Sequence, residues 1–296
     1  RAVYNTLAAV GSVKSLPVLA TAAKAAGFAD DATSANNSYL QLLSKLAASN
    51  PKLVAKAAKG LTKLTSPAMR TAGLRLLLQT AGNKASGEVL KALKDGDIEY
   101  RNTALAMAEQ VAGKGIFPAV ASKISSLPIA AQTDVVRWLG NNHAEDQIDV
   151  ITKQMTSPNA ALADAAIKAS GKIGGKKALA ALISLLGGEK ASLATQTLLA
   201  FNGNINDGVL EALASDNDGV QEVALKLASD RHIYAAYPLV QALLAKNGKP
   251  NAAAYEALKG VVKAENFPAM ASLLEGGEIV QQVPALQAAT ADAIRN

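Results

Sequence analysis

The sequence predicts an all-α fold of about nine stacked helix pairs, and three observations indicate it. Apolar residues make up 50% of the 296 residues but only 4% are aromatic, and most of the apolar ones are Ala and Leu. This composition favours helices that pack on helices. A large apolar residue returns about every 31 residues in the same helical context. Short turn signals with Gly, Asn or Pro separate the helical segments at regular intervals.

The segments between these turns form two alternating sets of predicted helices. Ser66 and Pro67 are the N-cap and first residue expected where a second-set helix begins. Glycines such as Gly113 stand where a helix is expected to stop. The first set comprises residues 53–64, 85–93, 117–124, 148–155, 178–186, 209–214, 236–244 and 268–274.

The second set carries large apolar residues at one helical phase, here named the internal row. The residue before each is mostly small after the first copy, which allows helices to approach closely. We expect the row to lie inside, because each pair can bury its apolar face only against its neighbours. The internal row is Leu43, Leu74, Leu105, Val136, Ile167, Leu198, Leu225, Leu258 and Leu286.

The whole chain, 1–296, is predicted to be one array, with atypical units in 1–49 and regular repeats in 50–296. Within the atypical units a turn lengthens to Gly27–Asn37, and Arg1–Val10 is predicted to be a second-set helix without its first-set partner. Because the chain starts at Arg1 without Met or a signal-like segment, we expect it to be a piece of a longer protein. Its last residues follow a second-set helix directly, as if another domain should follow.

Composition excludes several kinds of function. There is no Cys, so disulfides and thiolate metal or redox sites are excluded. No apolar run is long enough to span a membrane. The net charge of +6 comes without a dense basic cluster, so nucleic acid is not an expected partner. His143 and His232 occupy the same turn three repeats apart, about 25 to 30 Å, so they cannot share a metal. We predict no metal site and no cofactor.

One segment carries a family resemblance. The stretch AAIKASGKIGGKKALAALISLL, Ala165–Leu186, resembles the HEAT repeat in the short form of phycobilisome lyases, with an Ala-rich second helix, a Gly-containing turn and a Leu-rich first helix. The resemblance covers nearly the whole chain. It implies an armadillo-like, right-handed α-α superhelix, a fold that serves scaffolds, carriers, inhibitors and a few enzymes. Within the same stretch, Ser170–Lys177 fails the phosphate-loop pattern and is interpreted as a turn between repeats.

A weaker resemblance concerns the first unit. The stretch AAKAAGFADDATSANNSYLQLLSKL, Ala22–Leu46, is similar to HEAT regions of bacterial envelope proteins that carry a 3-keto-disaccharide hydrolase-type domain. It implies a periplasmic or cell-surface location and a carbohydrate-related context, with any catalysis in a flanking domain.

The candidate binding residues lie on the second set, which usually lines the concave face of such arrays. Asp164 and Glu222 each precede a basic residue by four positions, a helix-stabilising spacing. Arg101 and Asp134 complete the candidate surface. Two interpretations stay open, a solvated face with local ion pairs or a groove for an extended acidic partner. Five basic residues share one outward phase and are named the outward basic row: Arg75, Arg137, Lys168, Lys226 and Lys259.

The only tryptophan lies beside two of these charges. Asp134, Arg137 and Trp138 could form a recognition trio, as in a HEAT-like DNA glycosylase-type enzyme with a basic concave face. The equivalent positions in two other repeats are Leu76 and Met107, which favours a core position for Trp138 instead.

The leading prediction is a non-catalytic interaction or scaffold module. Without Cys and with two distant histidines, no set of nucleophile, base and orienting group can be assembled. The expected partner is a protein or a flanking domain of the same chain, or an extended acidic ligand.

Overall fold

The computed structural model describes residues 1–246, 249–275 and 280–296, and these residues are all-α except for a short hairpin. The first set of helices is α2 (Leu16–Ala25), α4 (Pro51–Leu61), α6 (Ala85–Ala92), α8 (Ile116–Ala121), α10 (Ile148–Thr152), α12 (Gly175–Ile183), α14 (Asn206–Leu213), α16 (Tyr237–Ala242) and α18 (Phe267–Glu275). The second set is α1 (Ala2–Val10), α3 (Ala35–Leu46), α5 (Pro67–Ala81), α7 (Ile98–Ala112), α9 (Ile129–Asn141), α11 (Ala160–Ile173), α13 (Ala191–Leu199), α15 (Asp218–Asp230), α17 (Ala252–Val261) and α19 (Val283–Arg295).

These helices confirm the predicted fold class. Each of the eight predicted first-set segments overlaps a helix, and α2–α3 to α18–α19 make nine pairs in the described residues. The helix α1 precedes the first pair, as the sequence predicts. The long turn is shorter than predicted, because α3 begins at Ala35 and takes Asn36 and Asn37 into its first turn.

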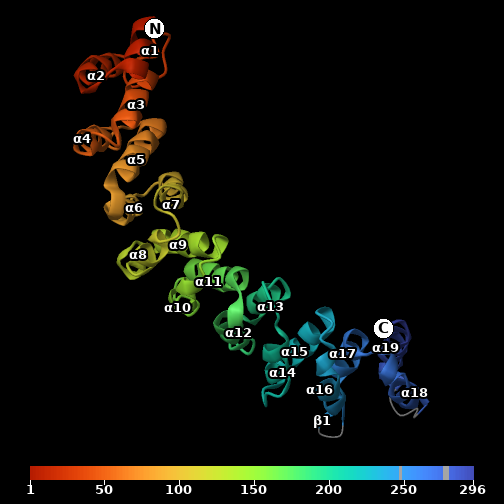
Figure 1. Ribbon diagram of the computed structural model, residues 1–296. Coiled ribbons are helices and arrows are strands. Elements are labelled where there is room, and N and C mark those ends of the chain that lie inside the picture. The colour runs from red at the N-terminus through yellow and green to blue at the C-terminus, as the bar shows by residue number, and fades with distance from the viewer. Residues whose placement is uncertain (247–248, 276–279) are drawn as a thin grey trace. The chain divides into compact units, whose positions relative to one another are not determined.

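The chain forms two compact units, Arg1–Trp138 and Leu139–Asn296, with the boundary inside α9. Within each unit the second-set helices lie side by side along one side and the first-set helices along the other (Figure 1). Each helix therefore packs on its own partner and on the same helix of the next repeat. That the chain is a single domain stays a prediction.

The internal row is buried throughout, as predicted. All nine of its side chains are at most 2% exposed. Some of the helices that carry the row begin with side-chain caps: Ser66 accepts from the N–H of Met69, and Asn159 accepts from the N–H of Leu162 at 3.1 Å. These caps satisfy N–H groups that would otherwise lack a partner at the start of the helix.

Close approach between repeats explains two glycines. A Cβ placed on Gly140 of α9 would lie 2.6 Å from the Cβ of Ala169 on α11, so only a residue without a side chain fits. Gly174, with φ of 79°, ends α11, and a Cβ there would lie 2.1 Å from the carbonyl oxygen of Asn202. The stretch Ser170–Lys177 thus contains the end of α11, a tightly packed turn at Gly174 and the start of α12, in agreement with the interpretation as a turn between repeats.

The short hairpin was not predicted. Strands β1 (Ala245–Lys246) and β2 (Lys249–Pro250) pair antiparallel between α16 and α17, where the sequence indicated only a turn. This hairpin brings Lys246 onto α15 and, together with Lys249, forms one wall of the pocket described below.

Candidate binding surface

The outward basic row is solvent-exposed at all five positions. Arg75 and Arg137 lie in the first unit, on α5 and α9, and the other three lie in the second. Within the described residues, Arg75, Arg137 and Lys168 form no ion pair. Two lysines are paired inside their own helix: Lys226 with Asp230 at 2.6 Å and Lys259 with Glu256 at 3.2 Å.

Two predicted pairings within helices are wrong. Asp164 does not pair with Lys168 four residues on; its carboxylate accepts from the ammonium group of Lys190, 2.6 Å away in the turn before α13. Glu222 likewise does not pair with Lys226, the lysine four residues on. Lys226 binds Asp230 instead, one turn later on the same side of α15. In the first case the partner comes from the next repeat, and in the second it is the carboxylate four residues after the lysine instead of the one four residues before it.

Arg101 and Asp134 are buried and bind each other. The guanidinium Nε of Arg101 donates to the carboxylate of Asp134 at 2.7 Å, and the two side chains are only 6% and 4% exposed. Arg101 also donates to the carbonyl oxygens of Asp95 and Gly96, at 2.9 and 3.0 Å. This pair joins α7 to α9 and holds the turn before α7. Its charges therefore stabilise the contact between repeats and do not face a partner.

A second cluster joins α5 to the same turn. The guanidinium of Arg70 lies 2.5 Å from the carboxylate of Asp95 and 4.2 Å above the ring of Tyr100. The N–H of Asp97 donates to Asp95, and together with Arg70 this holds the pKa of Asp95 below its usual range against the opposing effect of burial. Burial raises the pKa of Tyr100. Charges one repeat apart therefore clamp consecutive repeats together.

The trio Asp134, Arg137 and Trp138 does not meet at an open site. Asp134 is taken up by Arg101, and Trp138 is 8% exposed and packs edge-on against Phe117, with ring centroids 4.8 Å apart. Only Arg137 points to solvent. The core position predicted for Trp138 is confirmed, and the glycosylase-type arrangement of these three residues is not assembled.

The two histidines share a backbone conformation as well as a repeat position. His143 and His232 have φ of 49° and 50°, the left-handed region, at the ends of α9 and α15. The ring of His143 lies 2.7 Å from the carbonyl oxygen of Lys172 in the next repeat, which it satisfies. Within the described residues no group of three His, Cys, Asp or Glu side chains is placed to hold a metal ion.

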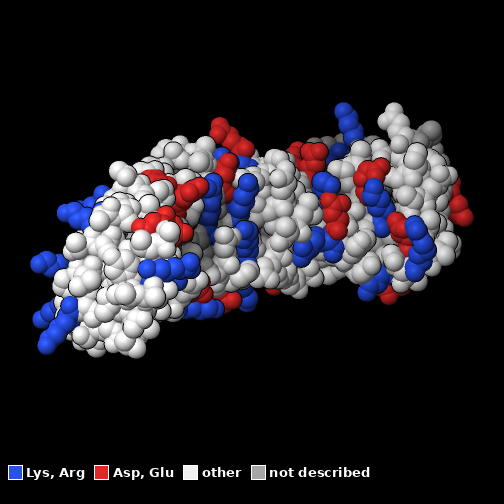
Figure 2. Space-filling model, turned by 90° about the horizontal axis from the view of Figure 1, so that it is seen from above, with Lys and Arg blue, Asp and Glu red and all other residues white. Residues whose placement is uncertain are grey.

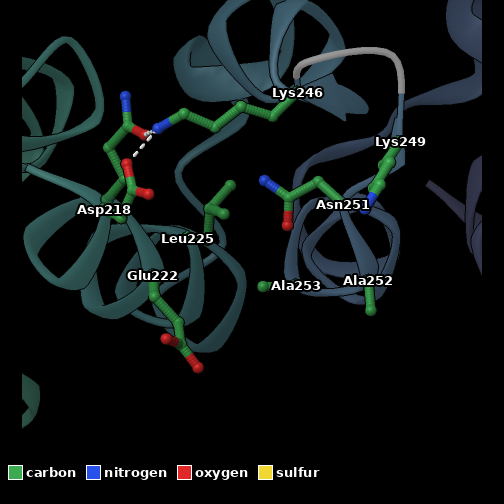
Figure 3. A pocket seen from close by; sticks show the side chains of 9 residues that line it. Asp218, Glu222, Leu225, Lys246, Lys249, Asn251, Ala252 and Ala253 are labelled. Carbon is green, nitrogen blue, oxygen red and sulfur yellow. Dashed lines mark hydrogen bonds and ion pairs between the residues drawn. The ribbon is translucent and has the colours of Figure 1, made fainter. Parts of the chain in front are cut away.

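An open pocket of about 390 Å³ lies between α15, the hairpin and the start of α17. Lys246 bridges one wall by binding Asp218 and, at 3.0 Å, the side chain of Gln221 (Figure 3). Asn251 points from the start of α17 toward Leu225.

Two charged side chains of this pocket have no ion-pair partner among the described residues. Glu222, a predicted site residue, and Lys249 line it and form no ion pair among the residues that the structure describes. Sequence reasoning missed the pocket, because the hairpin that supplies Lys246 and Lys249 was interpreted as a simple turn.

One face of the molecule can be seen to carry both signs of charge. Figure 2 shows one face of the molecule, on which Lys and Arg are interspersed with Asp and Glu and do not merge into one basic patch. No helix in the described residues is both long and apolar enough to cross a bilayer.

Comparisons with known proteins agree only at the level of fold. No protein-family model and no curated protein matches the chain. Among solved structures it is similar to YibA of Escherichia coli, with 15% identity, a TM-score of 0.38 and coverage of 81% of this chain and 92% of that one. It is also similar to human deoxyhypusine hydroxylase in complex with glycerol, with 14% identity, a TM-score of 0.34 and coverage of 85% and 100%. The fold is an array of stacked helix pairs, and the helices themselves establish this.

The prediction that the chain is not an enzyme is corrected by this comparison. Human deoxyhypusine hydroxylase is an enzyme, so an array of helix pairs is no evidence against catalysis. The lack of Cys and the distance between two histidines exclude only nucleophile–base arrangements built from them. At such low similarity no activity is carried over to this chain. The envelope location and the carbohydrate context stay predictions.

Proposed function

We propose that the chain is a partner-binding array whose outward basic side chains hold an extended acidic segment of another protein. The observation that carries the proposal is the contrast between charges at different helical phases. Arg101 and Asp134 are buried against each other, whereas Arg75 and Arg137 are exposed and without an ion pair in the described residues. The charged side chains that hold neighbouring repeats together are already bound to each other, whereas Arg75 and Arg137 remain available to bind a partner.

The spacing of the row determines the kind of partner. Arg75 on α5 and Arg137 on α9 are two repeats apart, and with helix axes 8–10 Å apart this is roughly 16–20 Å. The Debye length at physiological salt is about 8 Å, so the two charges do not act as one field. A compact anion would meet only one of them. An extended segment with several carboxylates can meet both, weakly and with an affinity that falls as salt rises.

The test is a charge reversal with a matched control in the same unit. A fluorescein-labelled peptide of about twelve glutamates, which reaches about 40 Å when extended, serves as the probe. Binding is measured by fluorescence anisotropy at low and physiological salt. Arg75→Glu with Arg137→Glu is compared with Lys52→Glu and Lys56→Glu, two exposed lysines of α4.

The proposal predicts unequal losses. Reversing two contacts worth about 1 kcal/mol each should weaken binding by about tenfold or more, while reversal on α4 should change it by less than about threefold. Equal losses from both pairs would mean that the peptide responds only to net charge, and the proposal would then be wrong.

A further inference from the structure

The pocket between α15, the hairpin and α17 has walls that are held by bonds within the chain. The ammonium group of Lys246 on β1 donates to Asp218 and to Gln221, so the hairpin is tied to α15. At the base of the hairpin the N–H of Asn251 donates to the carbonyl oxygen of Leu244 at 2.8 Å. Both walls are therefore fixed in place, as is usual for a small-ligand site.

Each of the two walls carries a pair of like charges. Asp218 and Glu222 are four residues apart on α15, so their side chains lie on one face of the helix. Lys246 and Lys249 are directly opposite each other in the register of the hairpin, which places their side chains on one face of it. Like charges at either spacing are destabilising. Each pair therefore costs folding free energy unless an opposite charge compensates it.

Only one charge of each pair is compensated among the described residues. Asp218 and Lys246 bind each other. Glu222 and Lys249 are exposed and form no ion pair in that part of the chain. They also do not meet across the pocket, because they lie on opposite sides of it with Ala253 between them (Figure 3). One carboxylate and one ammonium group are thus left at the two ends of the pocket.

The surface between these two charges is apolar and carries one amide donor. Leu225 and Ala253 line it. The Oδ1 atom of Asn251 accepts from the N–H of Ala254 at 3.3 Å, which fixes the orientation of the amide. Its NH2 group points into the pocket toward Leu225 (Figure 3). Because Asn251 follows the hairpin directly, this donor belongs to the same wall as Lys249.

We propose that the pocket binds a short peptide with free ends, with its ammonium group at Glu222 and its carboxylate at Lys249 and the amide of Asn251. An extended tripeptide is at most about 10 Å long. This length matches the roughly 8–10 Å between the axes of neighbouring helices such as α15 and α17. A single amino acid carries both charges on one carbon and is too short to reach both walls.

The size of the pocket suits such a ligand. Its volume of about 390 Å³ lies in the range of small-ligand sites, about 300–1,000 Å³. The site shares no residue with the outward basic row, so it is independent of the acidic partner proposed above.

The experiment is a titration of the chain with tri-alanine, followed in nitrogen–proton spectra by the side-chain NH2 signal of Asn251. This signal should shift with a Kd on the order of 1 mM, because exposed charge contacts contribute little each. Acetylating the amino end or amidating the carboxyl end removes one charge and should weaken binding about fivefold. Free alanine should leave the signal in place.

Two variants identify which wall holds which end. Glu222→Gln should bind tri-alanine about fivefold more weakly and should no longer distinguish it from the acetylated form. Lys249→Gln should likewise no longer distinguish it from the amidated form. Lys226→Gln is the matched control, because this exposed lysine of α15 is bound to Asp230, and it should bind like the wild type. All three residues are exposed, so circular dichroism should be unchanged.

Four results would each overturn the proposal. They are an Asn251 signal that does not move at about 10 mM tri-alanine, end-blocked peptides that bind as tightly as the free one, alanine that binds like tri-alanine, and variants that discriminate between the peptides as the wild type does.

Discussion

Removing the Asp134 carboxylate should be among the most destabilising changes in the first unit. Asp134→Ala leaves the guanidinium of Arg101, 6% exposed, without the partner that lies 2.7 Å from its Nε. Breaking a buried pair from one side costs about 3–5 kcal/mol. Arg101→Met with Asp134→Leu removes both charges and forfeits two hydrogen bonds to carbonyl oxygens of about 1 kcal/mol each. The double variant should therefore be about 1–3 kcal/mol less stable than the wild type.

The assay is urea unfolding followed by tryptophan fluorescence. Trp138 is the only tryptophan and lies one turn after Asp134 on α9, so its signal reports this region of the chain. Lys226→Ala, which breaks an exposed pair in the other unit, is a control for general effects and should cost less than about 1 kcal/mol. Arg101→Met alone and Asp134→Leu alone complete the cycle. The reasoning is refuted if the double variant loses as much stability as these two single variants together, because the two side chains would then be uncoupled.

Three further predictions concern single positions. Trp138→Ala should cost about 3–5 kcal/mol in urea unfolding, since the ring is buried against Phe117. His232→Gly should stabilise the chain by up to about 1 kcal/mol by relieving a left-handed backbone, whereas His143→Gly should change little because it also loses the bond to a carbonyl oxygen; thermal unfolding of both variants checks this. The pKa of Asp95 is lowered in the folded chain, so its contribution is complete above 3.8 and lost as pH falls through the lowered value. Asp95→Asn should therefore lose less thermal stability than the wild type between neutral pH and about pH 3.

The repeat architecture could be predicted because large apolar residues define it. A residue such as Leu74 must be buried in any stack of helix pairs, and its recurrence every 31 positions fixes both the phase and the number of repeats. The start of α5 could be predicted as well, because Ser66 needs only local N–H groups to act as a cap.

The roles of the charged residues could not be predicted from the same pattern. Helical spacing pointed Asp164 toward a residue on its own helix, but its partner Lys190 lies 26 positions on, in the next repeat. Arg101 and Asp134 are 33 positions apart. Opposite charges separated by about one repeat length were the signal available for these clamps. A charged residue has several candidate partners of opposite sign. Side-chain conformation and close packing decide which of them it binds, and the sequence pattern contains neither.

The pocket depended on a feature with no periodic signal. The hairpin between β1 and β2 occurs in one repeat only among the described residues, so comparison among repeats could not reveal it. Neither of its two lysines was a predicted site residue. The helical phase of Glu222 on α15 made it a predicted site residue, but no sequence pattern indicated the hairpin that also lines the pocket.

The most direct test of the proposed function is to observe the arginine side chains while an acidic peptide binds. Nitrogen–proton spectra of the arginine Nε groups are recorded as the oligoglutamate peptide is added. The account predicts that the signals of the exposed Arg75 and Arg137 shift, while that of Arg101, held by Asp134, stays in place. Binding that leaves Arg75 and Arg137 unshifted, or that moves Arg101 equally, would contradict it.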